Sequence, residues 1–268
     1  LLFFISIFFF SLSISGYGKL INLKIKKNFF LEIFLGIIIL TFIITLIHFF
    51  FRISLILSLS MFGLGLILFL KKKDFELSDL LKINNIYFLV IIIFFIPMFL
   101  SQKYHEDFGY YHLPYALGFI EEKIVFGYAN IEKSYVYNSI WLNLYSAFFL
   151  DSKNYNFLTL PSFLIFLAFI FFSLNQIISK KNLLTSDYYL IVILFYFILK
   201  FTRISEFGVD LPAVIFSILG IYYFINFNET DSFEDKQAYF FLILVFSVFS
   251  ILIKLSTLPI ILLPSYLY

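Results

Sequence analysis

The sequence has no cysteine and few charged residues, and these absences exclude several classes of protein. Without cysteine the chain can contain no disulfide framework, thiolate metal site or cysteine nucleophile. A glycine-rich phosphate loop, an HExxH zinc motif and a nucleophile elbow are also missing. The net charge of +2 is too small to indicate nucleic acid as a partner. Charged residues form 13% of the chain, whereas soluble domains contain about 25%.

Apolar residues dominate the sequence instead. They form 62% of the 268 positions, phenylalanine alone occurs 42 times, and the mean hydropathy is +0.99. A soluble domain of this size has too little interior to bury so much apolar surface, because its accessible surface is still large relative to its volume. The composition therefore predicts an all-α, polytopic transmembrane helix bundle, with the lipid bilayer as its surroundings.

Apolar runs that approach or reach the length of a membrane-crossing helix recur along the whole chain. Such a helix needs about 17–25 mostly apolar residues. Because both ends of the sequence are apolar and begin or stop abruptly, we also expect the chain to be a fragment of a longer protein. The predicted spans are residues 1–17, 29–51, 53–70, 84–100, 157–178, 186–201, 211–227, 238–253 and 256–268.

Lysine distribution predicts the orientation of these spans. The loops 18–28 and 71–83 carry four lysines each, so we place both on the cytoplasmic side. The apolar run 139–150 would reach only about 18 Å as a helix, which is too short to cross a bilayer core of about 30 Å. We therefore predict an interfacial or re-entrant helix there, and an external loop that covers residues 101–156.

Two helices are predicted within this external loop. Pro114 suits a first helical turn and Gly127 a C-terminal stop, which indicates an amphipathic helix over 114–126 with Leu117, Ile120 and Ile124 on its apolar face. Asn138 or Ser139 can cap the second helix, 139–150. Eight tyrosines and the single tryptophan, Trp141, lie between 104 and 145, and such residues commonly form a belt at the membrane interface.

Ionisable residues converge on the predicted external side. The same orientation places the 203–210 connection and Lys254 on the side of the external loop. Ionisable residues near the ends of apolar spans usually line a cavity, although the acids of the loop could be solvated and Lys254 could extend to the interface. The convergent residues are Asp107, His112, Arg203, Asp210 and Lys254.

A metal site is a further hypothesis for the external loop. The residue types of His105, Glu106, Asp107 and His112 suit zinc or manganese, but their spacing matches no metal-binding signature. A divalent metal ion is therefore the one cofactor that the sequence raises.

The order of these features resembles the GT-C superfamily of integral-membrane glycosyltransferases, which use polyprenyl-phosphate-linked sugars. The resemblance rests on span 84–100, the acidic pair Glu106–Asp107 after it, the two loop helices and Asp210 after later spans. Residues 107–114, Asp-Phe-Gly-Tyr-Tyr-His-Leu-Pro, also resemble uncharacterised bacterial polytopic proteins related to that superfamily. The resemblance implies a GT-C-like module over 84–268, preceded by an N-terminal unit of about three spans over 1–83.

By this resemblance, the protein would transfer a sugar from the lipid carrier to an acceptor outside a bacterial cytoplasmic membrane, as part of cell-envelope synthesis, with inversion at the anomeric carbon. Asp107 would be the general base, with Glu106 and His112 assisting. The substrate and its phosphate would be bound by Arg203, Asp210, Lys254 and Tyr111. A transporter or flippase, and a non-catalytic membrane assembly subunit, are the alternatives from other classes.

Overall fold

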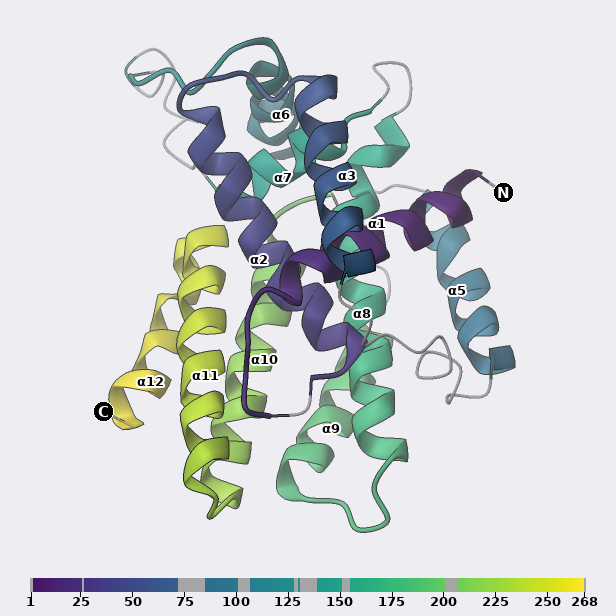
Figure 1. Cartoon of the computed structure of the whole chain (residues 1–268), viewed down its shortest axis with the longest axis vertical. Coiled ribbons are helices and arrows are strands. Elements are labelled where there is room, and N and C mark those ends of the chain that lie inside the picture. Colours follow the sequence, from purple (N-terminus) through teal and green to yellow (C-terminus); the bar gives the residue numbers. More distant parts are fainter. Residues whose placement is uncertain are drawn as a thin grey trace.

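The fold is entirely helical over the part of the chain that the computed structural model describes (Figure 1). The described residues are 2–25, 27–71, 85–100, 107–127, 130, 139–150, 155–200 and 207–267. No strand occurs in these ranges, which confirms the all-α prediction.

The long helices follow the predicted spans closely. They are α1 (Leu2–Gly18), α2 (Phe29–His48), α3 (Leu55–Lys71), α5 (Asn85–Leu100), α8 (Leu160–Ile178), α9 (Thr185–Leu199), α10 (Asp210–Glu229) and α11 (Phe233–Ile253). The described chain closes with the 3₁₀ turns η6 (Leu255–Ile261) and the short α12 (Leu262–Leu267), so the predicted span 256–268 is not one continuous α-helix.

Four helical segments of the described chain are long and apolar enough to cross a bilayer. The other long helices are apolar but shorter. The protein is therefore a multi-pass helical membrane protein, as its composition predicts. The four segments are Phe29–His48, Phe157–Ile178, Asp210–Glu229 and Phe233–Ile253.

Polar contacts at one end of the bundle involve the predicted cytoplasmic loop 18–28 and the α8–α9 and α10–α11 connections. Lys24 in the α1–α2 loop forms an ion pair with Glu234 at the start of α11, with 3.0 Å between Nζ and Oε1. The backbone N–H of Ser186, at the start of α9, donates to the Glu229 carboxylate at the end of α10. This is the lower end in Figure 1, opposite α6 and α7. Its assignment to the cytoplasm stays a prediction.

The first three helices interlock through glycine, which lets their backbones approach closely. A Cβ added at Gly36 in α2 would lie 1.9 Å from the carbonyl oxygen of Ile14 in α1, so no side chain fits there. Gly16 of α1 meets the backbone of α3 at Gly65 in the same way. Helices that pack in lipid depend on such contacts, because apolar side chains gain little by leaving lipid for one another.

One hydrophobic core joins these helices to the rest of the described chain. The ring of Phe34 in α2 packs edge-to-face against Phe172 of α8 and Phe216 of α10, with ring centroids 5.9 and 6.3 Å apart. The proposed division into units 1–83 and 84–268 therefore does not coincide with a break in packing, and it stays a prediction from the resemblance.

The first loop helix differs from its prediction. A π-helical turn, η1 (Phe108–His112), leads into α6 (Leu113–Glu121), which ends five residues before the expected 126. The chain is extended at Glu122, and the N–H of Ile124 donates to the carbonyl of His48 at the end of α2. This tertiary hydrogen bond replaces further helix.

The buried face of α6 also differs from the predicted stripe. Tyr115, Ala116 and Phe119 pack into the protein, whereas Leu117 and Ile120 of the predicted stripe are half-buried and Ile124 lies beyond the end of the helix. Gly127 is not a helix stop, but lies in a turn with φ +96°.

The second loop helix, α7 (Ile140–Phe148), is capped as predicted, because the Ser139 hydroxyl accepts a hydrogen bond from the N–H of Trp141. Every residue of α7 after Ile140 is buried, so the helix is enclosed by the bundle rather than laid on its surface. The expected interfacial role of Trp141 was therefore wrong. His48 connects α2 to both loop helices by hydrogen bonds. Its Nδ1 lies 2.7 Å from Asn143 Oδ1 in α7, and its Nε2 lies 3.1 Å from the carbonyl oxygen of Glu122 at the end of α6.

Candidate functional site

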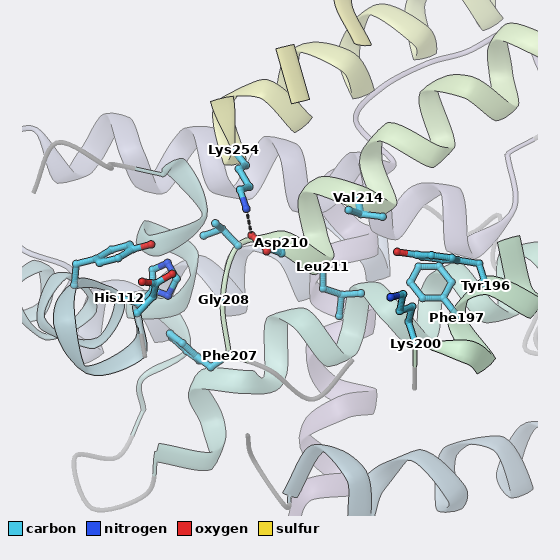
Figure 2. A pocket seen from close by; sticks show the side chains of 13 residues that line it. His112, Tyr196, Phe197, Lys200, Phe207, Gly208, Asp210, Leu211, Val214 and Lys254 are labelled. Carbon is cyan, nitrogen blue, oxygen red and sulfur yellow. Dashed lines mark hydrogen bonds and ion pairs between the residues drawn. The ribbon is translucent and has the colours of Figure 1, made fainter. Parts of the chain in front are cut away.

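A cavity of about 280 Å³ lies where the predicted external ends of α9, α10 and α11 meet the loop turn η1 (Figure 2). Its two sides differ in chemistry. One side carries ionisable and aromatic residues, namely Asp107, Tyr111, His112, Phe207, Asp210 and Lys254. The other side combines apolar residues with one lysine, namely Tyr196, Phe197, Lys200, Leu211 and Val214.

An ion pair between Asp210 and Lys254 stands between the two sides (Figure 2). Asp210 is the first residue of α10 and Lys254 follows the last residue of α11, so each charge is favoured by the dipole of its helix. The two side chains are 74% and 40% exposed. Exposed pairs contribute only about 0–1 kcal/mol, so an anionic ligand could separate Lys254 from Asp210 at little cost.

A serine–threonine network, Ser217, Ser250 and Thr257, fixes the chain around Lys254. The Ser250 hydroxyl donates to the Ala213 carbonyl of α10 over 2.8 Å and lies 2.7 Å from the Ser217 hydroxyl. Thr257 donates to the carbonyl of Lys254 itself over 2.8 Å. These bonds hold the break between α11 and η6 against α10, so the lysine extends from a fixed backbone.

The π-helical turn η1 positions His112. The N–H of Leu113 donates to the carbonyl of Phe108, one residue further back than in an α-helix. Single π turns occur frequently at functional sites because they reorient the side chains that follow. His112 is buried, and a Cβ added at Gly208 would lie 3.6 Å from its Cε1, so the ring lies against the backbone before α10.

Tyr145 of α7 anchors the same backbone segment. Its hydroxyl donates to the Gly208 carbonyl over 2.7 Å and lies 2.6 Å from the Ser162 hydroxyl of α8. Its ring stacks on Phe207 with centroids 4.3 Å apart. Burial raises the pKa of Tyr145 to about 12, so the hydroxyl keeps its proton at physiological pH.

Five of the predicted site residues line this one cavity: Asp107, Tyr111, His112, Asp210 and Lys254. The loop residues and Asp210 are about a hundred positions apart in the sequence, and Lys254 follows Asp210 by 44 positions, yet all of them line the same cavity. The other three, His105, Glu106 and Arg203, lie outside the described residues. The chemical role of each residue stays a prediction.

A metal centre receives no support from the described part of the chain. Within it, no three histidine, aspartate or glutamate side chains are close enough together to hold one ion. The hypothesis depends on His105 and Glu106, which are outside the described residues.

Sequence reasoning missed Lys200 and Tyr145. Lys200 ends the apolar run of α9 on the predicted external side, a position equivalent to that of Lys254, and that similarity was a usable signal. Tyr145 was one of many tyrosines, and only the fold distinguishes it.

The fold and the cavity define a multi-pass α-helical membrane protein with a polar site near the ends of its helices. The chain belongs to the family described as a domain of unknown function, DUF8201, which matches it over residues 1–268. No curated protein and no solved structure matches the chain.

Proposed function

We propose that the protein is a glycosyltransferase that moves a sugar from a polyprenyl-phosphate carrier to an acceptor on the external face of a bacterial cytoplasmic membrane. The observation that carries this proposal is the composition of the cavity. A carboxylate and a histidine from the loop, Asp107 and His112, share it with two lysines at helix ends, Lys200 and Lys254.

These groups suit a single displacement at the anomeric carbon. Asp107 accepts the proton of the acceptor hydroxyl, and the acceptor oxygen forms a bond to the anomeric carbon. The bond from that carbon to the phosphate oxygen breaks, and its electron pair leaves with the lipid phosphate. Lys254 stabilises the negative charge that develops on the phosphate. His112, buried beside Gly208, assists proton transfer, and the sugar is transferred with inversion.

The position of the cavity fits a substrate that stays in the membrane. The last turn of α9 supplies Tyr196, Phe197 and Lys200 to the cavity, while Ile198 and Leu199 beside them are 67% and 83% exposed. In a membrane protein, exposed apolar side chains on such a helix face lipid. A lipid-linked donor could therefore reach the cavity sideways from the bilayer, without passing through water.

The test is transfer by the protein in proteoliposomes, with a polyprenyl-phosphate hexose labelled in the sugar and released polyprenyl phosphate as the readout. Asp107→Asn keeps the shape of the side chain but removes its basicity, so the rate should fall about 10²–10⁴-fold. Asp231→Asn, an exposed position in the opposite α10–α11 loop, is the matched control and should transfer normally.

Three results would change the proposal. Normal transfer by Asp107→Asn together with inactivity of Glu106→Gln would exchange the roles within that pair. Normal transfer by Asp107→Asn, Glu106→Gln and Lys254→Met would overturn the mechanism. Movement of an intact donor across the bilayer without release of polyprenyl phosphate would favour a flippase.

A further inference from the structure

The apolar side of the cavity carries one charged residue, Lys200, to which the proposed displacement assigns no step. Lys200 caps the C-terminal end of α9, where its backbone N–H donates to the Tyr196 carbonyl over 3.0 Å. Within the described residues no carboxylate forms an ion pair with Lys200, whereas Lys254 is paired with Asp210. In Figure 2 the amino group of Lys200 points toward the side where Leu211 lies. A lysine placed in this way favours an anionic ligand.

The surface that leads to Lys200 is apolar and faces outward. Side chains one and two turns apart on α9 form an exposed stripe that ends one residue before the lysine. Its members and their exposed fractions are Tyr188 59%, Val192 64%, Phe195 63% and Leu199 83%. Residues four and seven apart lie on one face of a helix, so the stripe is continuous along α9.

Val214 continues this apolar surface onto α10. It is 37% exposed and lines the cavity together with Leu211, opposite Tyr196 and Phe197. The arrangement therefore consists of a cation at the rim of a polar cavity, an apolar gap between α9 and α10, and a lipid-facing stripe beyond it. A ligand with an anionic head and a long hydrocarbon chain is complementary to all three.

We infer that the C-terminal end of α9 and the N-terminal end of α10 form a binding site for a lipid with a phosphate head group. The phosphate binds Lys200, and the hydrocarbon chain passes between Tyr196 and Val214 and then along α9. This inference rests on the proposed function in one respect, since it makes the bound lipid the donor. Binding itself needs no transfer, so it can be measured separately. The phosphate then lies between Lys200, which holds it, and Lys254, which stabilises the charge that develops on it during the proposed displacement. The sugar that it carries extends toward Asp107 and His112.

The test uses polyprenyl phosphate with a photoreactive diazirine in its chain, added to the full chain in lipid nanodiscs. After illumination, labelled peptides should come from the end of α9 and the start of α10. Lys200→Gln should weaken labelling about tenfold, the size of a lost hydrogen bond to a charged group. Lys200→Arg should retain it. The matched control is Lys181→Gln, an exposed lysine in the α8–α9 loop at the opposite end, which should label normally.

A second pair of variants tests the apolar half. Val214→Trp fills the gap between the helices and should abolish labelling. Leu244→Trp on α11, an equally exposed position at 40%, should not. Hexose 1-phosphate, which has the charge but no chain, should fail to compete.

Other outcomes would overturn the inference. Unchanged labelling in Lys200→Gln or Val214→Trp would contradict the proposed lipid-binding site. Equal competition by hexose 1-phosphate would show a site for free phosphate esters. Crosslinks between α9 helices of two copies would show a protein interface there instead. Specific labelling without sugar transfer would support the lipid-binding site and contradict the proposed function. Transfer without such labelling would support the proposed function and contradict the lipid-binding site.

Discussion

Replacement of Tyr145 by phenylalanine tests whether α7 holds the cavity in shape. The substitution keeps the ring, and with it the stacking on Phe207 at 4.3 Å. It removes the hydroxyl, and with it the hydrogen bonds to the Gly208 carbonyl at 2.7 Å and to the Ser162 hydroxyl at 2.6 Å. Gly208 lies two residues before Asp210, so the backbone that carries one wall of the cavity loses its hydrogen bond to α7 but keeps the ring contact through Phe207.

The expected loss of unfolding free energy follows from these two bonds. Each intramolecular hydrogen bond contributes about 0.5–1.5 kcal/mol, and a buried group left without a partner adds to the loss. We therefore expect Tyr145→Phe to destabilise the protein by about 1–3 kcal/mol. The control Tyr188→Phe, on the exposed face of α9, should change stability by less than about 0.5 kcal/mol.

Unfolding in detergent, followed by loss of helical circular dichroism, measures both variants. Ser162→Ala should add little on top of Tyr145→Phe, because the two hydroxyls share one bond and their effects are not additive. Burial raises the pKa of Tyr145 from 10.0 to about 12, so the wild-type advantage should be constant below pH 10 and decline between pH 10 and 12. Equal stability of Tyr145→Phe and Tyr188→Phe would refute the anchoring role of α7.

Two further predictions concern the fold and its orientation. Gly36→Ala should be less stable than Gly63→Ala by at least about 1–3 kcal/mol. An added Cβ would lie 1.9 Å from the Ile14 carbonyl oxygen at Gly36, whereas it would meet nothing within 4 Å at Gly63. Equal melting temperatures of the two variants would mean that α1 and α2 are further apart. Since the chain has no cysteine, single introduced cysteines report the membrane topology directly. Lys123→Cys should react with an impermeant thiol reagent in intact cells, and Lys181→Cys should react only after permeabilisation. The opposite pattern would reverse the predicted orientation.

The spans could be predicted from the sequence because hydropathy alone determines which segments lipid accepts. The predicted span 186–201 is close to α9, Thr185–Leu199. Helix ends in water follow other signals. α11 begins at Phe233, five residues before the predicted 238, because the Ser232 hydroxyl accepts from the N–H of Asp235 and the first turn is acidic. Hydropathy does not register that polar first turn.

Part of the site could be predicted for a similar reason. Counting spans predicts on which side a charge emerges, so Asp107, Asp210 and Lys254 could be grouped from the lysine-rich loops and the short length of the run 139–150. Distances and packing could not be obtained in this way. The end of α6 depends on a hydrogen bond from Ile124 to His48, 76 positions earlier, and nothing near Ile124 in the sequence indicates it. Tyr145 acquires its role only because α7 is enclosed by the bundle.

The stereochemistry of the product tests the central claim most directly. Purified protein in proteoliposomes would receive a polyprenyl-phosphate hexose of known anomeric configuration and a soluble alcohol as acceptor, and the product would be analysed by nuclear magnetic resonance. A single displacement at the cavity predicts release of one polyprenyl phosphate for each glycoside formed, with the opposite anomeric configuration. A product with the donor's configuration, or no glycoside while Lys200-dependent lipid labelling persists, would contradict the account.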